Sequence, residues 1–417
     1  MRPARGTRPL ALFGTPGVVR LWLAGLGAGV MRWLDMLAFS LYAFAETGSP
    51  LIVTLVAFAR MLPLLVLGAV AATWAERFDR RRLLLGIFAG MAGMFLALAL
   101  LSQAGMMNVA VVAGASFVTG LFWAFEIPVR RTMLAEAAGM ARVNTSMGLE
   151  MATTQLTRLL GPLTGGALIA AAGLDGVFLL GTALYGGSAA LLFGLPQAAR
   201  AAGRARRPVL GELLVGLAFV RRHRLIAAVV VSTGLFNLWY LPYVALAPVV
   251  AETALGLSPG PIGVLMAAEG VGAVLGSIWI ATLARPAWFC LLYSVGGAAI
   301  AVGVLVFALA GHAAVGFVAL ALGGVGIAGF ATMQTTLVLA AAPAAMRVRV
   351  MGVVMVAIGT APFGFVLTGL LAERLGSQTA LATIAALGAA AMLACMVVWP
   401  ELRRAEPPPS AEAPARE

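Results

Sequence analysis

A short charged stretch between two long apolar runs constrains this sequence most. Residues 51–72 are nearly all Leu, Val and Ala, and residues 83–101 are apolar again. Each run is long enough to cross the ~30 Å hydrocarbon core of a bilayer as a helix. The stretch between them holds Glu76, Arg77, Asp79, Arg80, Arg81 and Arg82. Arginines between two spans indicate a cytoplasmic loop, and the apolar flanks disfavour a solvated charge run on a soluble protein.

The rest of the chain repeats this pattern, which predicts an all-α membrane protein. Of its 417 residues, 62% are hydrophobic and 11% are charged, and the mean hydropathy is +1.00. Soluble domains are about 25% charged. An even number of spans would leave residues 1–20 and a disordered tail, 400–417, in the cytoplasm. We predict twelve spans, at 21–46, 50–72, 83–102, 106–127, 144–172, 176–195, 225–253, 260–283, 287–310, 314–341, 350–372 and 379–399.

The distribution of arginine supports this topology. The net charge is +12, and all 28 basic residues are Arg because the sequence has no Lys. Most of them fall in segments predicted to be cytoplasmic. Arg374 falls on the other side, and Arg32, Arg60 and Arg158 lie within predicted spans. The charge therefore follows the positive-inside rule of a multi-pass cell-membrane protein and does not indicate a nucleic-acid partner.

Residues 196–224 divide the chain into two halves. They are rich in Arg and end in an amphipathic piece, so we predict a cytoplasmic linker that lies partly on the membrane surface. The flanking halves, 21–195 and 225–399, place arginines at corresponding positions: Arg77 matches Arg285, and Arg142 matches Arg349. This correspondence predicts a duplicated six-helix unit.

The charged loop resembles the signature between the second and third helices of the major facilitator superfamily. Its Arg-Phe-Asp-Arg-Arg-Arg ending, residues 77–82, is similar to that of the bacterial exporters that include the enterobactin exporter and macrolide-efflux proteins. Ala72, Glu76 and Asp79 replace the family's Gly, Asp and second Gly. The resemblance implies a transporter with twelve helices in two pseudo-symmetric six-helix bundles. It also implies a conformational latch at Glu76, Arg77, Asp79, Arg80 and Arg81.

The fifth predicted span carries a second pattern. Glu150, Arg158, Gly161 and Gly165 are three or four residues apart or multiples of that spacing, so they share a helix face. The run Gly161-Pro162-Leu163-Thr164-Gly165-Gly166 resembles the fifth-helix signature of proton-coupled antiporters in the superfamily. A glycine-rich packing face without a role in transport is the alternative.

The acidic residues within spans are candidates for proton coupling, because a charge in mid-bilayer must face a cavity or a partner. They are Asp35, Glu126, Glu150 and Glu269. Asp35 lies one turn from Arg32, with Trp33 between them, so these two charges either neutralise each other or leave Asp35 as a protonation site. Arg60 in the second span could pair with Asp35 or Glu150.

Two further acids, Glu126 and Glu269, lie in the fourth and eighth predicted spans. Glu126 precedes Arg130 and Arg131, which favours an ion pair with the following loop over proton transfer. Glu269 has no basic residue within a turn, so we predict an unpaired carboxyl that could bind a proton near neutral pH.

Aromatic and polar residues predict a substrate cavity for amphipathic organic molecules. Asn237 and Tyr240 share one face of the seventh span beside Trp239, and Gln334 adds a polar group from the tenth. Arg32, Trp33 and Arg60 would line the same cavity from the N-terminal half. Trp239 could instead belong to an aromatic belt at the membrane interface.

Several other activities are disfavoured. Without Lys the chain lacks a phosphate-binding P-loop, so we expect no ATP hydrolysis, no cofactor and no enzymatic activity. Cys290 and Cys395 lie in apolar runs, and His223 and His312 fall on opposite sides of the membrane, so we expect no disulfide and no metal site. The glycines of residues 324–329 match a dinucleotide-binding pattern but lie inside a span, where close helix packing explains them.

These observations lead to one main hypothesis and two alternatives. The chain is predicted to be a monomeric secondary transporter that exports small organic or amphipathic molecules, of the drug or siderophore class, in exchange for protons across the lipid bilayer. A uniporter or importer of a metabolite with the same fold is the first alternative. A membrane receptor that does not transport is the second.

Overall fold

The computed structural model describes residues 12–75, 78–139, 142–195 and 209–404. Those residues are helical and contain no strand. The helices are α1 Pro16–Thr47, α2 Pro50–Ala75, α3 Arg80–Gln103, α4 Val109–Ala138, α5 Val143–Phe193, α6 Val209–Arg222, α7 Arg224–Trp239, α8 Tyr243–Thr253, α9 Pro259–Leu283, α10 Phe289–Leu309, α11 Ala313–Ala341, α12 Arg347–Ile358, α13 Ala361–Leu375 and α14 Ser377–Val398, with short 3₁₀ turns at Pro286–Trp288 (η3) and Pro400–Arg403 (η4).

Ten helical stretches among the described residues are long and apolar enough to cross a membrane. One of them is α5, whose 51 residues would make a straight helix of about 75 Å. That length is more than twice the ~30 Å of a hydrocarbon core. The helix bends at Gly173, where φ is 62° and ψ is −159°, a conformation that residues with a Cβ rarely adopt. The two spans predicted at 144–172 and 176–195 are therefore joined by a kink and not by a loop.

Two other predicted spans are each broken in the middle. The stretch predicted at 225–253 forms α7 and α8, and the stretch at 350–372 forms α12 and α13. The break between α12 and α13 lies against α7, because the Thr360 hydroxyl donates to the Gly234 carbonyl at 2.8 Å. Gly364 permits this approach, since a Cβ there would lie 2.1 Å from the Leu238 carbonyl oxygen.

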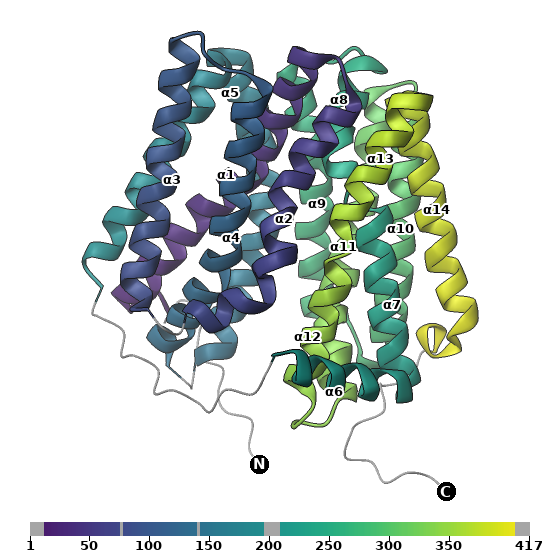
Figure 1. The fold of residues 1–417 in the computed structure, drawn as a ribbon. Helices are drawn as coiled ribbons and strands as arrows, with labels where there is room; N and C mark the ends of the chain where they lie inside the picture. Colours follow the sequence, from purple (N-terminus) through teal and green to yellow (C-terminus); the bar gives the residue numbers. More distant parts are fainter. Residues whose placement is uncertain (1–11, 76–77, 140–141, 196–208, 405–417) are drawn as a thin grey trace, which may run out of the picture.

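The two halves of the chain lie side by side (Figure 1), with α1–α5 in purple to blue and α7–α14 in green to yellow. The α5 helix packs against α9, and α2 packs against α13. The amphipathic α6 crosses one end of the molecule (Figure 1), which we call the α6 end; the opposite end, with the turns after α1 and α13, is the far end.

The structure corrects the predicted ends of several segments. The α4 helix continues through Pro128 to Ala138, so Arg130 and Arg131 lie on the helix and not in a loop. The predicted tail begins with η4, whose Leu402 is 1% exposed. The Ser294 hydroxyl donates to the Leu402 carbonyl at 2.9 Å, which explains why the tail's first residues are ordered. Residues 405–417 lie outside the described part of the chain.

Candidate functional site

One buried ion pair joins the two halves of the molecule. Arg158 of α5 binds Glu269 of α9, and these side chains are 17% and 4% exposed. Glu269 also accepts a hydrogen bond from the Tyr243 hydroxyl of α8, and the Arg158 guanidinium lies 4.4 Å from the centre of the Trp33 ring of α1. We call these four residues the seam site.

The seam site corrects the prediction for Glu269. Its carboxyl is not unpaired, because Arg158 reaches it from a helix more than a hundred positions away in the sequence. The prediction considered only basic residues within one helical turn of Glu269, so it could not identify a partner on another helix. The free space beside the pair is about 30 Å³, and the residues that line it include Met36, Pro162 and Met266.

A second group of charges lies inside the N-terminal half. Arg60 of α2 donates to Asp35 of α1 at 2.8 Å, and the two side chains are 2% and 0% exposed. Arg60 also donates to the Arg32 carbonyl at 3.2 Å. Arg32 itself binds Glu126 of α4 at 3.2 Å, so Arg32 and Asp35 do not pair as their spacing suggested. Arg60 therefore pairs with Asp35, which is one of its two partners predicted from the sequence.

Trp123 of α4 is a residue that the sequence reasoning missed. Its ring centre lies 4.7 Å from the Arg32 guanidinium and 5.6 Å from that of Arg60. The indole therefore stabilises two neighbouring cations through cation–π contacts. The sequence spacing could have identified Trp123, because it shares one face of α4 with two charged residues. The residues on this face, three or four positions apart, are Thr119, Trp123, Glu126 and Arg130.

Glu126 and Glu150 share a single arginine. Arg130 donates to both oxygens of Glu150, at 2.8 and 2.6 Å, and its Nε donates to Glu126. Arg131 also lies 3.5 Å from Glu150. The predicted ion pair of Glu126 with the residues after it is present, and its partner is Arg130. These ion pairs connect Arg32, Glu126, Arg130 and Glu150, and the Asp35–Arg60 pair joins them through the hydrogen bond of Arg60 to the Arg32 carbonyl. We call this group from α1, α2, α4 and α5 the N-half network.

The glycines of the fifth predicted span lie at helix crossings. A Cβ on Gly161 would lie 2.5 Å from the Cβ of Trp33, and one on Gly165 would lie 3.1 Å from Leu34, both on α1. A Cβ on Gly166 would lie 2.6 Å from the Cα of Gly263 on α9. Pro162 stands inside α5 without ending it. The pattern thus places α5 against both α1 and α9, close to the seam site.

The charged loop makes contacts within the N-terminal half. Asp79 caps α3 by accepting from the Arg82 backbone N–H at 2.8 Å. Arg80 binds Glu136 of α4, and Arg81 donates to the Leu192 carbonyl at 3.0 Å. Glu76 and Arg77, the other two predicted latch residues, lie outside the described part of the chain.

Two of the four predicted cavity residues of the C-terminal half, Asn237 and Gln334, meet at Thr233, while Trp239 and Tyr240 have other neighbours. Asn237 donates to the Thr233 carbonyl of its own helix at 2.9 Å, and Gln334 donates to the Thr233 hydroxyl at 2.8 Å. The Cβ of Trp239 lies 3.1 Å from the Cβ position of Gly388 on α14, so its side chain starts toward α14. Tyr240 alone lies near the seam site, with its ring centre 5.0 Å from that of Tyr243.

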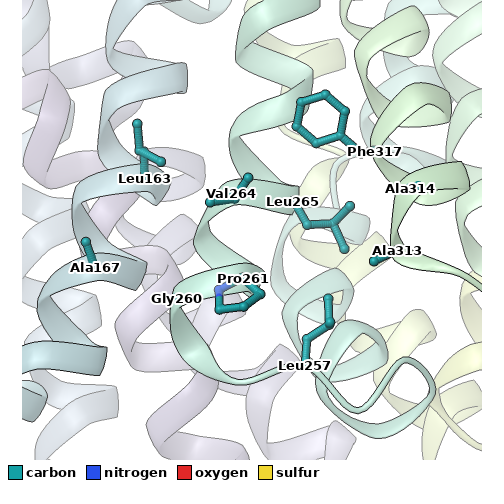
Figure 2. Close-up of a pocket in the computed structure, with 10 residues that line it drawn as sticks. All are labelled: Leu163, Ala167, Leu257, Gly260, Pro261, Val264, Leu265, Ala313, Ala314 and Phe317. Carbon is teal, nitrogen blue, oxygen red and sulfur yellow. The ribbon is translucent and has the colours of Figure 1, made fainter.

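A larger pocket of about 600 Å³ lies between α5, α9 and α11 near the far end. Figure 2 shows its lining, which is apolar throughout and includes Leu163, Val264, Leu265 and Phe317. Val264 is 47% exposed, so the pocket faces the surroundings of the helices. Its lining offers no polar side chain that could orient a substrate, so the seam site is the better candidate for a functional site.

The family profile described as transmembrane secretion effector matches residues 7–417. The chain belongs to this family of the major facilitator superfamily. It is 26% identical over 379 residues to the multidrug efflux pump Tap of Mycolicibacterium fortuitum, covering 85% of this chain and 88% of that protein. It is also 28% identical over 253 residues to the uncharacterized MFS-type transporter YfiS of Bacillus subtilis (strain 168), an alignment that spans 58% of each chain.

Solved transporters share the fold of this family member. The nucleoside transporter NupG superposes with a TM-score of 0.75 at 13% identity, over 92% of this chain and 100% of that one. A bacterial homologue of the human lysosomal transporter Spinster, inward-facing and unoccupied, gives a TM-score of 0.69 at 14% identity, over 95% and 96% of the two chains. The chain is thus a multi-pass membrane transport protein whose helices follow the major facilitator fold.

Proposed function

We propose that this protein is a secondary active transporter that exports small organic or amphipathic molecules, of the drug or siderophore class, in exchange for protons by alternating access. The observation that supports this proposal is the buried Arg158–Glu269 pair, because it joins helices of the two halves. Alternating access requires these halves to move against each other. The similarity to a multidrug efflux pump favours export of organic molecules over uptake.

We propose twelve membrane crossings in two six-helix bundles, residues 21–195 and 225–399. In this scheme α1 and the two parts of α5 on either side of Gly173 each cross once. The broken pairs α7–α8 and α12–α13 each make one crossing. The positive-inside rule then puts both termini and α6 in the cytoplasm.

The contacts between the halves favour an inward-facing state. Near the far end the halves touch closely: the Ser49 hydroxyl donates to Glu373 at 2.8 Å, and a Cβ on Gly369 would lie 2.0 Å from the Thr54 hydroxyl oxygen. At the α6 end, the ion pairs of Arg80 and Arg349 instead stay within one half. In this proposal the charged loop after α2 closes the α6 end in the opposite state.

We propose Glu269 as the coupling acid. Arg158 contacts it from the other half, and Tyr243 and Tyr240 are its neighbours within its own half. Protonation of Glu269 would remove its attraction to Arg158. Removing one partner of a buried ion pair costs about 3–5 kcal/mol. A proton on Glu269 would therefore change the relative free energy of the two states. Asp35, Glu126 and Glu150 pair within the N-terminal half, so their protonation acts less directly on the seam.

Substitution of Glu269 tests this coupling. We expect Glu269→Gln in proteoliposomes to lose export driven by a proton gradient, and the proton flux that accompanies it, by at least about tenfold. The transported compound would be the one that most raises the melting temperature in a screen of siderophores, macrolides and lipophilic cations. Proton movement would be followed with a pH-sensitive dye inside the vesicles.

The matched control is Glu252→Gln, which makes the same chemical change at the far end of α8. We expect it to keep wild-type coupling. Export by Glu269→Gln with unchanged proton flux would contradict the proposal that Glu269 is the coupling acid. Uptake by the wild-type protein without any dependence on the gradient would instead indicate a uniporter or importer.

A further inference from the structure

Each charge of the seam site has a second, neutral partner. Arg158 lies over the Trp33 ring, and Glu269 accepts from the Tyr243 hydroxyl. These partners come from α1 and α8, outside the two helices that carry the pair. When Arg158 and Glu269 separate, each therefore keeps a favourable contact. These contacts lower the energetic cost of separating Arg158 from Glu269.

A guest can enter the seam site only between the two charges. The free space of about 30 Å³ holds little more than a water molecule while the pair is closed. The site is neutral overall, with one cation and one anion in an otherwise uncharged lining. A guest that carries a single charge would pair with one residue and leave the other buried without its counter-ion, which is costly.

A guest with both charges avoids this cost. Its carboxylate would form an ion pair with the Arg158 guanidinium, and its ammonium would form one with the Glu269 carboxylate. The site therefore stays neutral when the guest binds. Met36 and Met266 line the space beside the pair, and their flexible side chains can adapt to apolar groups of different shape. We propose that the exported molecule is a zwitterion whose charged groups are a few bonds apart and whose body is apolar or aromatic. This inference rests on the proposed function and specifies the substrate class at the same site.

Three molecules with the same indole body test the proposal. Tryptophan carries both charges, tryptamine lacks the carboxylate, and indole-3-propionate lacks the ammonium. Binding to the wild-type protein in lipid nanodiscs would be measured by isothermal titration calorimetry at neutral pH. We expect tryptophan to bind at least about tenfold more tightly than either of the others, because only tryptophan replaces both halves of the ion pair.

Substitutions that change the net charge of the site give a sharper test. Arg158→Gln leaves one negative charge, so we expect tryptamine to become the preferred ligand. Glu269→Gln leaves one positive charge, so indole-3-propionate should be preferred. The matched control is Glu401→Gln, which removes a carboxylate from the Arg224–Glu401 pair at the α6 end and should keep the wild-type order of affinities.

The result that would overturn the proposal is a wild-type protein that does not bind tryptophan, or an order of affinities that does not change in either variant. Both measurements are made without a gradient, so they do not depend on proton coupling. A protein that prefers tryptophan but moves no protons would contradict the proposed function and leave the substrate class standing. Proton-driven export of a singly charged compound, with no preference for zwitterions, would support the proposed function and contradict the proposed substrate class.

Discussion

Arg60 shows how strongly a single buried charge depends on its neighbours. The side chain is 2% exposed, and its ion-pair partner Asp35 is fully buried. Its other contacts are the Arg32 carbonyl and the Trp123 ring. None of these neutral contacts replaces a carboxylate, so the charge of Arg60 is tolerated because Asp35 is present.

We predict that Asp35→Asn lowers the stability of the protein by about 3–5 kcal/mol, because it leaves Arg60 buried without a counter-ion. The apparent melting temperature in detergent should fall clearly. The double variant Asp35→Asn with Arg60→Met should recover most of this loss, since it removes the uncompensated charge. Equal melting temperatures for the single and double variants would show that the two residues do not depend on each other.

Sequence reasoning identified the charged residues but only some of their partners, such as Arg60 for Asp35 and Arg130 for Glu126. Arg32 and Asp35 are one turn apart on α1, yet they pair with different helices. Which helix a side chain meets depends on the rotation of each helix about its own axis, and hydrophobic periodicity is weak when a helix is apolar all round. The partner of Glu269 was missed for the same reason.

At the scale of the helices, glycine decides how closely neighbours approach. The carbonyl of Arg60 on α2 lies against Gly120 of α4, where an added Cβ would be 1.8 Å away. Gly114 on the same helix has open space around its Cβ position. Alanine substitutions at Gly120 and Gly114 therefore distinguish the effect of helix packing on stability from the effect of intrinsic helix propensity.

We predict that Gly120→Ala destabilises the protein by about 1–3 kcal/mol, because the added methyl group forces α2 and α4 apart. Gly114→Ala should instead leave stability unchanged or raise it by about 0.5–1 kcal/mol through the better helix propensity of alanine. Thermal unfolding of both variants in the same detergent would compare them. A similar fall for both would contradict the assigned contact.

The positions of most helices follow from the apolar runs, but their interruptions do not. The break before Tyr243 contains Pro242, yet Pro128 and Pro162 lie inside helices that continue. The kink at Gly173 replaces a loop that the sequence had suggested. Proline and glycine allow a break, and packing against neighbouring helices determines whether it occurs.

For the molecule as a whole, the proposed alternating-access cycle requires the contact between the halves at the far end to open. Thr54 of α2 and Gly369 of α13 lie close enough for a cross-link, because the Cβ of Thr54 is 3.2 Å from the Cβ position of Gly369. A disulfide needs Cβ atoms about 3.5–4.5 Å apart, so only a slight separation of the helices is required.

We predict that Thr54→Cys with Gly369→Cys loses transport to background after oxidation and regains it after reduction. The variant would be made with Cys290 and Cys395 replaced by serine, and Thr54→Cys alone is the control. Substrate efflux from vesicles would be measured before and after treatment. Full transport by the oxidised, cross-linked protein would rule out movement between α2 and α13.

The attachment of α6 has a consequence for observing such movement. Glu212 binds Arg349, and the Cβ position of Gly216 lies 2.7 Å from the Arg349 carbonyl oxygen. The helix is thus fixed to α12 and travels with the C-terminal half. A fluorescent dye on the exposed Leu214 and a second on the exposed Thr132 of α4 would report the distance between the two halves, and its changes would follow the proposed transport cycle.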